Sequence, residues 1–189
     1  MRQIEILDKK RVFDDFFKID EVRIKYEKFN GEITPIHRRL NFERGDSVAA
    51  IVYNEDSKKV ILVNQFRYPS YTKGNGWLTE VVAGVLNEGE NPETAIKREI
   101  LEEIGYKTTR LTHISTFFVS PGGTSERIIL YYVVVNDLDK TSTGGGISSE
   151  HEDIKLIEYT LEELWNSLNK GKIKDAKTII ALMWLKLRK

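Results

Sequence analysis

The segment from Gly84 to Tyr106 constrains the fold of this chain more than any other part of its sequence. Asn91 followed by Pro92 is typical of a helix start, because asparagine caps orphan N–H groups and proline lacks only an N–H that would stay unpaired there. Gly105 tolerates the positive φ with which many helices end. The segment therefore predicts a helix from about Pro92 to Ile104.

The predicted helix has two faces of opposite character. Isoleucines recur every fourth residue and predict a buried stripe: Ile96, Ile100 and Ile104. Glutamates at positions i, i+3 and i+4 share another face: Glu99, Glu102 and Glu103. Like charges so placed repel one another, and a bound Mg²⁺ would reverse that cost. A solvated acidic face is the alternative, and the three glutamates alone favour it.

The wider spacing changes this interpretation. The segment reads G-x5-E-x7-R-E-U-x-E-E-x-G-U, where U is a bulky apolar residue, and in this it resembles the Nudix box. All seven fixed positions are filled: Gly84, Glu90, Arg98, Glu99, Glu102, Glu103 and Gly105. Tyr106 is an aromatic residue where an aliphatic one is more usual. The resemblance implies a hydrolase that uses a divalent metal, Mg²⁺ or alternatively Mn²⁺, to cleave a nucleoside diphosphate linked to another group.

Bulk properties set further bounds. The 189 residues suffice for one domain with a full core. Because 29 basic residues balance 29 acidic ones, no net charge favours nucleic acid or a membrane surface as a partner. No cysteine is present, which excludes a disulfide scaffold. The N-terminus lacks the apolar core of a signal peptide, so we expect a cytoplasmic protein.

The chain divides into two predicted domains. Residues 1–45 predict a small antiparallel β subdomain, with alternating apolar residues from Val22 to Tyr26, a hairpin turn at Asn30–Gly31 and a returning strand over 32–42. This piece has little apolar surface, so we expect it to pack on the main domain or on a second subunit. Residues 46–189 form the predicted Nudix hydrolase domain.

Within the main domain, strands alternate with helices. Apolar runs predict strands over 48–53, 59–66, 77–82, 111–118 and 127–135. A surface loop is expected over 67–76 and a mobile one over 137–152, which contains three consecutive glycines. Thr160-x-x-Glu163 predicts a capped helix, and Asp175 a cap for the last one. This α/β (α+β) pattern predicts a mixed β-sheet sandwiched between helices, which is the Nudix fold.

The acidic helix supplies the candidate metal ligands. Glu99 and Glu103 are one turn apart and best placed, with Glu102 as the third. The resemblance adds the backbone carbonyl of Ala83. Arg98 is expected to orient Glu90 or a neighbouring carboxylate, since its alternative role as an exposed ion pair is worth little.

A general base must come from elsewhere, because carboxylates that bind metal accept protons poorly. The segment Glu150-His151-Glu152-Asp153-Ile154 is similar to one that serves this purpose in related nucleoside diphosphate sugar hydrolases. The resemblance implies that Glu150 is the base and that Glu152 is a further metal ligand and substrate contact. Which of the two accepts the proton is open, and a polar loop without a catalytic role is the alternative.

Substrate contacts are predicted among basic and aromatic residues. Arginines suit phosphates, which they bind through two nitrogens, and phenylalanine suits a nucleobase, on which it can stack. For each residue alone an ordinary surface or core role is the simpler interpretation, but similar enzymes place ligands at matching positions. The candidates are Phe17, His37, Arg38, Arg39, Arg67, Glu126 and Lys177.

Features of two subfamilies coexist. Pro121 lies sixteen residues beyond Gly105, as in members that hydrolyse ADP-ribose. Overall length, the triple glycine and Lys174–Thr178 look more like members that hydrolyse GDP-mannose to GMP and mannose 1-phosphate, and we favour that substrate. Both subfamilies form homodimers through N-terminal strands, which implies the same here. A non-catalytic nucleotide-sugar sensor is a further alternative, although this chain retains every glutamate of the box.

Overall fold

The computed structural model describes residues 2–147, 149 and 151–188. The chain forms two compact units, one made of residues 1–46 with 118–127 and the other of residues 47–117 with 128–189. None of the helices in these described ranges is long and apolar enough to cross a membrane. The assignment of residues 1–45 to dimerisation stays a prediction.

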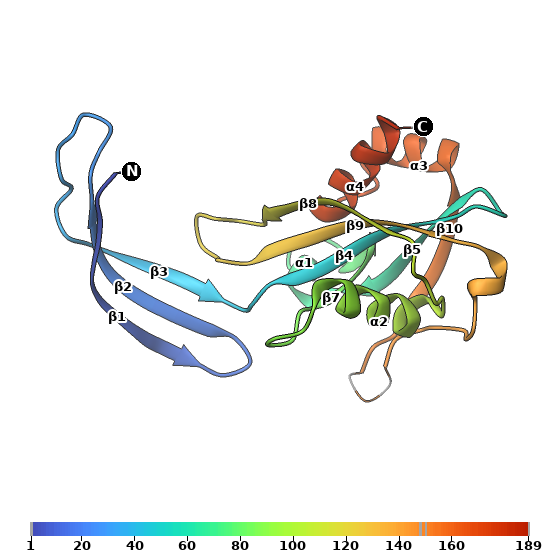
Figure 1. Ribbon diagram of the computed structural model, residues 1–189, viewed down its shortest axis with the longest axis horizontal. Coiled ribbons are helices and arrows are strands. Elements are labelled where there is room, and N and C mark those ends of the chain that lie inside the picture. Colours follow the sequence, from blue (N-terminus) through green and yellow to red (C-terminus); the bar gives the residue numbers. More distant parts are fainter. Residues whose placement is uncertain (1, 148, 150, 189) are drawn as a thin grey trace. The chain divides into compact units, whose positions relative to one another are not determined.

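The first unit is built on a three-stranded antiparallel sheet, in the order β1–β2–β3 (Figure 1). Its strands are β1 (Ile4–Asp14), β2 (Lys18–Tyr26) and β3 (His37–Glu43). The predicted turn is confirmed, since Gly31 has a φ of +85° and donates its N–H to the Lys28 carbonyl. The returning strand begins at His37 rather than at residue 32, and Pro35, which has no N–H to donate, lies in the intervening segment.

The segment 118–127 belongs to this unit through contacts with β3. The Phe42 N–H donates to the Gly123 carbonyl over 2.8 Å. The side chain of Asn41 donates to the Ser125 hydroxyl over 3.1 Å.

The second unit contains a seven-stranded mixed sheet, ordered β10–β5–β4–β9–β8, with β6 paired to β5 and β7 to β4. Strands β4 and β9 are parallel, whereas β4–β5 and β10–β5 are antiparallel. The strands are β4 (Ser47–Asn54), β5 (Lys59–Phe66), β6 (Trp77–Glu80), β7 (Val82–Val85), β8 (Leu111–Phe118), β9 (Arg127–Val135) and β10 (Lys155–Thr160).

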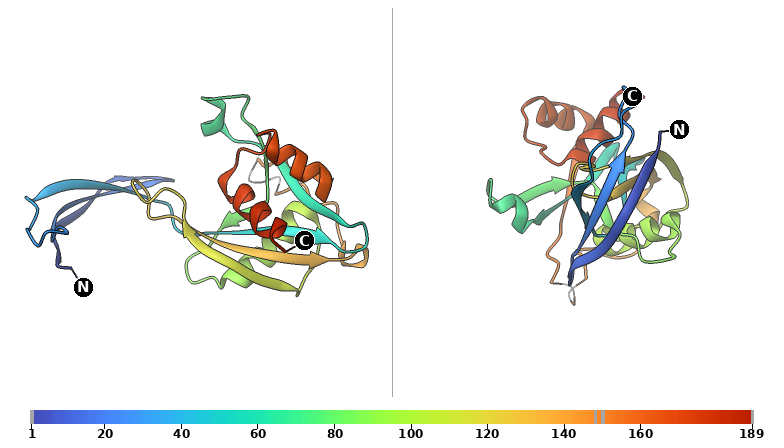
Figure 2. Two further views of the ribbon diagram at one scale, coloured as in Figure 1. Left: turned by 90° about the horizontal axis from the view of Figure 1, so that it is seen from above. Right: turned by 90° about the vertical axis from the view of Figure 1, so that its left-hand side faces the viewer.

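Helices cover both faces of this sheet, as predicted. Helix α2 (Pro92–Ile104) packs on one face, and α3 (Leu161–Asn169) and α4 (Ala176–Lys186) pack on the other (Figure 1, Figure 2). Strand β4 is buried at every position. Its alternate residues therefore serve two cores. Val48, Ala50 and Val52 join the α2 core, while Ala49, Ile51 and Tyr53 join the α3–α4 core.

The predicted helix ends are confirmed. The Asn91 side chain accepts from the N–H groups of Glu93 and Thr94, and Gly105 ends α2 with a φ of +78°. Thr160 and Glu163 form the capping box of α3. Asp175 accepts from the Thr178 N–H at the start of α4.

Four elements differ from the sequence prediction. The strand predicted over 77–82 is broken at Val81, whose N–H donates to the Thr178 hydroxyl instead of to a strand. The chain thereby passes from pairing with β5 to pairing with β4. The loop after β5 contains a one-turn helix, α1 (Tyr68–Tyr71), and β10 and the 3₁₀ helix η1 (Asp137–Asp139) lie in regions that carry weak periodic signals.

Candidate active site

Glu103 is the most deeply buried carboxylate of α2, with only 2% of its surface exposed. The backbone N–H of Ala83, on β7, donates to this carboxylate. Its Oε2 atom is buried and has no hydrogen-bond partner among the described residues. A buried carboxylate oxygen in this state is costly. The site therefore contains an acceptor that a ligand can satisfy.

Glu99 lies one turn earlier, against the backbone of Gly84. A Cβ atom on residue 84 would overlap the Glu99 carboxylate, so only glycine leaves room for it. Strand β7 and helix α2 are thus close enough for a helix carboxylate to rest on strand backbone.

Both carboxylates are shifted towards the protonated form. Burial raises the pKa of Glu99 to about 6, and the charges of Glu102 and Glu152 contribute although Arg98 opposes them. Burial raises the pKa of Glu103 well above its usual range, with further contributions from Glu99 and Glu152. Carboxylates that hinder each other's ionisation in this way are stabilised by a cation between them.

Arg98 pairs with three carboxylates at once. Its Nη1 lies 2.8 Å from Glu99 Oε1 and 3.0 Å from Glu102 Oε2, while Nε lies 3.3 Å from Glu90 Oε1. The guanidinium holds the pKa of Glu90 below its usual range. Arg98 thus contacts the carboxylates that it is expected to orient, and the orienting role itself stays a prediction.

Glu152 reaches the same region from the loop that follows β9. The N–H groups of Gly145 and Gly146 donate to the carbonyls of Glu103 and Glu102, which fastens this loop to the end of α2. The Ile147 N–H donates to the Glu152 carboxylate over 2.9 Å. Glu150 lies outside the described residues.

These groups fit a divalent cation. Within residues 2–147, 149 and 151–188 no three acidic or histidine side chains converge closely enough to hold a metal as they stand. The unpartnered oxygen of Glu103, the pKa of Glu99, which is raised although Arg98 is its partner, and the proximity of Glu152 nevertheless describe carboxylates whose negative charge the neighbouring arginine does not fully offset. Hard oxygen donors of this kind suit Mg²⁺.

Arg67 and Lys177 both contact Glu80, which was not among the predicted site residues. Glu80, on β6 and 3% exposed, accepts from Arg67 Nε over 2.9 Å and from Lys177 Nζ over 2.6 Å. Lys177 also lies 3.0 Å from Asp175. In the strand predicted over 77–82, Glu80 alternates with the apolar Leu78 and Val82, and a charge on such a face needs a partner.

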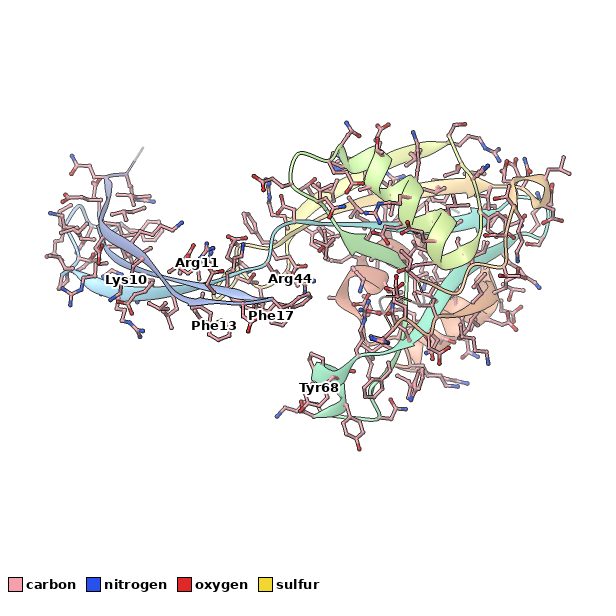
Figure 3. All side chains as sticks on the ribbon, turned by 90° about the horizontal axis from the view of Figure 1, so that it is seen from below. Lys10, Arg11, Phe13, Phe17, Arg44 and Tyr68 are labelled. Carbon is pink, nitrogen blue, oxygen red and sulfur yellow. The ribbon has the colours of Figure 1, made fainter. Side chains whose placement is uncertain are left out.

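The other predicted substrate contacts belong to the first unit. Phe17, which is labelled in Figure 3, lies in the segment that joins β1 to β2 and packs edge-on against Phe42, with ring centroids 5.0 Å apart. The His37 Nδ1 atom lies 2.9 Å from the Pro35 carbonyl. Glu126 lies 3.6 Å from Arg44.

Arg38 and Arg39 line a cavity of about 510 Å³ in this unit, together with β2 and β3 residues and the 122–123 turn. Arg38 Nε donates to Glu21 over 2.5 Å, and Arg39 Nη1 donates to the Arg38 carbonyl over 3.1 Å. The predicted site residues are thus divided between the units. The second unit gathers the carboxylates of α2, Glu152, Ala83 and Arg98, and separately joins Arg67 to Lys177.

Comparison with known proteins adds an independent finding. Residues 43–182 match the family model described as NUDIX domain. The ADP-ribose pyrophosphatase of Escherichia coli is 35% identical over 187 residues, which cover 97% of this chain and 88% of that protein. The GDP-mannose pyrophosphatase of Cronobacter sakazakii is 33% identical over 187 residues, covering 98% and 96%.

A solved structure described as "Crystal structure of ADP compounds hydrolase" has the same fold. It aligns with a TM-score of 0.72 at 20% identity and covers 98% of this chain and 93% of its own. The family match extends over most of the chain and includes the acidic helix whose geometry is described above. This chain therefore belongs to the Nudix hydrolase family.

Proposed function

We propose that this protein hydrolyses the pyrophosphate bond of a nucleoside diphosphate sugar with the help of Mg²⁺, and that its preferred substrate is GDP-mannose, cleaved to GMP and mannose 1-phosphate. The observation that carries the proposal is the buried, unpartnered Oε2 of Glu103 beside the charges of Glu99 and Glu152. The names of two relatives at 33–35% identity support the substrate class.

The residues of the second unit would divide the work as follows. Glu99, Glu103, Glu152 and the Ala83 carbonyl would hold the cation, with Glu102 close by. Bound Mg²⁺ supplies positive charge beside the diphosphate oxygens and lowers the pKa of a water. Arg98 balances the charge of the helix carboxylates and fixes their orientation.

The proton of the attacking water requires a base. We propose Glu150 for this role, with Glu152 as the alternative. Rates of Glu150→Gln and Glu152→Gln across pH distinguish them, since loss of the base removes the acidic limb of the pH profile.

Arg67 and Lys177 are proposed to bind phosphate or sugar in the same unit. For the first unit we propose that Phe17 stacks on the base and that His37, Arg38, Arg39 and Glu126 contact substrate across a homodimer interface.

The exposed apolar surface of β1 supports the proposed homodimer. Most apolar side chains of β1 are exposed in the single chain, including Ile4 at 69% and Phe13 at 49%. Light scattering tests the proposed homodimer. A protein that is monomeric and fully active would refute it.

ADP-ribose is the second candidate. It is favoured by the 35% identity to the Escherichia coli ADP-ribose pyrophosphatase and by Pro121. GDP-mannose is preferred because the alignment covers 96% of the GDP-mannose pyrophosphatase and because the triple glycine and the Lys174–Thr178 segment resemble that subfamily.

Incubation with Mg²⁺ and either GDP-mannose or ADP-ribose, followed by separation of the nucleotide products, tests the proposal. We expect GMP from GDP-mannose with a higher kcat/KM than AMP from ADP-ribose. A higher kcat/KM with ADP-ribose would instead make ADP-ribose the preferred substrate. Tight binding of either substrate without turnover would instead support a non-catalytic sensor.

A further inference from the structure

Glu80 is a buried carboxylate for which the proposed reaction has no assigned task. It lies in β6, where only 3% of its surface is exposed. Removing a carboxylate from water is costly, and the cost is offset only by well-placed positive partners. Glu80 has two such partners, Arg67 and Lys177, from elements distant in the chain.

The contacts form a chain that starts at helix α4. Asp175 accepts from the Thr178 N–H over 2.9 Å and from its hydroxyl over 2.6 Å, which fixes the carboxylate at the helix start. Lys177 Nζ lies between Asp175 and Glu80, at 3.0 and 2.6 Å. Glu80 then accepts from Arg67 Nε over 2.9 Å. Each charged group is thus held by the one before it.

Arg67 is the exposed end of this chain. Its side chain is 41% exposed, in contrast to 12% for Lys177. Its backbone is also held, because its N–H donates to the Gly76 carbonyl and its own carbonyl accepts from the Ser70 hydroxyl. Among the hydrogen bonds of the described residues, the guanidinium uses only Nε, so both terminal nitrogens keep their donors.

Arg67 is anchored near the carboxylates of α2. Its partner Glu80 lies four residues before Gly84, whose backbone is in contact with the Glu99 carboxylate, and four residues of extended chain span at most about 14 Å. A guanidinium anchored through Nε presents two parallel N–H donors, the arrangement that binds phosphate oxygens in pairs.

We propose that Glu80 is a positioning residue: it orients the guanidinium of Arg67 for the diphosphate of the substrate, while Lys177 and Asp175 hold Glu80 in place. This inference rests on the proposed function. Without Glu80, Arg67 samples other rotamers and pairs with the carboxylates of α2, so substrate binding must supply the ordering that Glu80 provides in the intact protein. The resulting decrease in kcat/KM is therefore expected to arise mainly from a higher KM.

A purely structural role predicts a different result. In that case the ion pairs only fasten α4 and β6 together, and their loss lowers stability and activity regardless of which residue stands at position 67. The two roles are separated by a double-mutant cycle between Glu80→Gln and Arg67→Met. Glu158→Gln, which removes an exposed pair with Lys59, is the matched control.

For each variant of the cycle, kcat and KM are measured with GDP-mannose and with ADP-ribose in the presence of Mg²⁺. The Kd for GDP-mannose is measured by calorimetry in EDTA. Glu80→Gln is expected to lower kcat/KM by about 10- to 100-fold in the wild-type background, chiefly through KM, because a hydrogen bond between charged groups is lost. In the Arg67→Met background the same change is expected to cost less than about threefold. Glu158→Gln is expected to behave as the wild type.

Equal losses from Glu80→Gln in both backgrounds, in kcat/KM and in Kd, would overturn the proposal and leave a structural role. If Glu80→Gln does not fold, Glu80→Asp takes its place in the cycle, since it keeps the charge but shortens the reach. A wild-type protein that turns over neither substrate would refute the proposed function and this inference with it, whereas an active wild type without coupling refutes only the role of Glu80.

Discussion

At the scale of single residues, Glu103 shows how the fold places a charge where it is unfavourable without a ligand. The apolar stripe of α2 packs on the sheet, and the residue before Ile104 is drawn into the same buried region. A neutral isostere would avoid the burial of charge. The glutamate therefore lowers the stability of the metal-free protein and is explained by what its oxygens can bind.

Glu103→Gln is expected to lower kcat at least about 100-fold, because a charge that would stabilise the cation is lost. The same change is expected to raise the free energy of unfolding in EDTA at pH 7 by about 1 kcal/mol or more, since the buried charge is removed. Urea unfolding and steady-state rates measure both effects. Glu162→Gln, at an exposed position of α3, serves as control, and a large loss of stability in Glu103→Gln would contradict this account.

Gly84→Ala tests the close approach of strand and helix. The added methyl group overlaps the end of the Glu99 side chain, which can swing away, and the backbone at residue 84 needs no positive φ. We expect a Tm close to that of the wild type and a loss of at least about tenfold in kcat/KM, as is typical when a ligand is displaced. Gly74→Ala, where the methyl group meets only an ordinary contact at 3.8 Å, should leave both unchanged.

At the scale of secondary-structure elements, the end of α2 and the loop after β9 depend on each other. Gly105, at the end of the helix, and Gly144, in the loop, lie so close that a side chain on either would strike backbone. Four loop N–H groups donate to carbonyl acceptors there. Thr141 and Ser142 donate to Gly105, Gly145 donates to Glu103, and Gly146 donates to Glu102. The contact determines where Glu152 lies relative to α2.

Gly105→Ala is expected to lower the free energy of unfolding by about 2–4 kcal/mol, because it combines a positive φ with a backbone clash. Gly171→Ala is the matched control: Gly171 also has a positive φ, but a Cβ there meets nothing within 4 Å. That variant should lose only about 1 kcal/mol. If urea unfolding shows the same decrease in the free energy of unfolding for Gly105→Ala and Gly171→Ala, the contact between α2 and the loop contributes little to stability.

At the scale of the whole molecule, the proposed metal binding would link the stability of the protein to the ionisation of the same carboxylates. The folded protein holds the pKa of Glu99 at about 6, above the ordinary 4.5. Between these values the folded state binds more protons than the unfolded state. The free energy of unfolding of the metal-free protein therefore receives a contribution from Glu99 that decreases as pH rises through this window.

Compared with Glu99→Gln, the wild type in EDTA is expected to lose on the order of 1–2 kcal/mol between pH 4.5 and pH 6.5. Mg²⁺ should raise the Tm of the wild type more at pH 7.5 than at pH 5, because it binds the deprotonated carboxylates. Urea unfolding at both pH values and thermal scans with Mg²⁺ measure these effects. A wild type that gains stability over the window relative to Glu99→Gln would contradict the raised pKa.

Much of the second unit follows from local signals. The bounds of α2, β5, β8 and β9 match their predictions, because caps and apolar runs act within a few residues. The break at Val81 could not be predicted in the same way. It depends on a hydrogen bond from Val81 to Thr178, 97 residues away in the chain.

The sequence by itself determined the acidic helix, its ends, its buried stripe and the residues that make the chain a member of its family, because these depend on neighbours one or two turns apart. Only the tertiary structure decided which carboxylates are buried, that Glu152 lies near Glu99 and Glu103, and that Glu80 joins Arg67 to Lys177. The physical reason is that burial and pairing of charge depend on contacts between distant segments, and no local pattern encodes which segments meet.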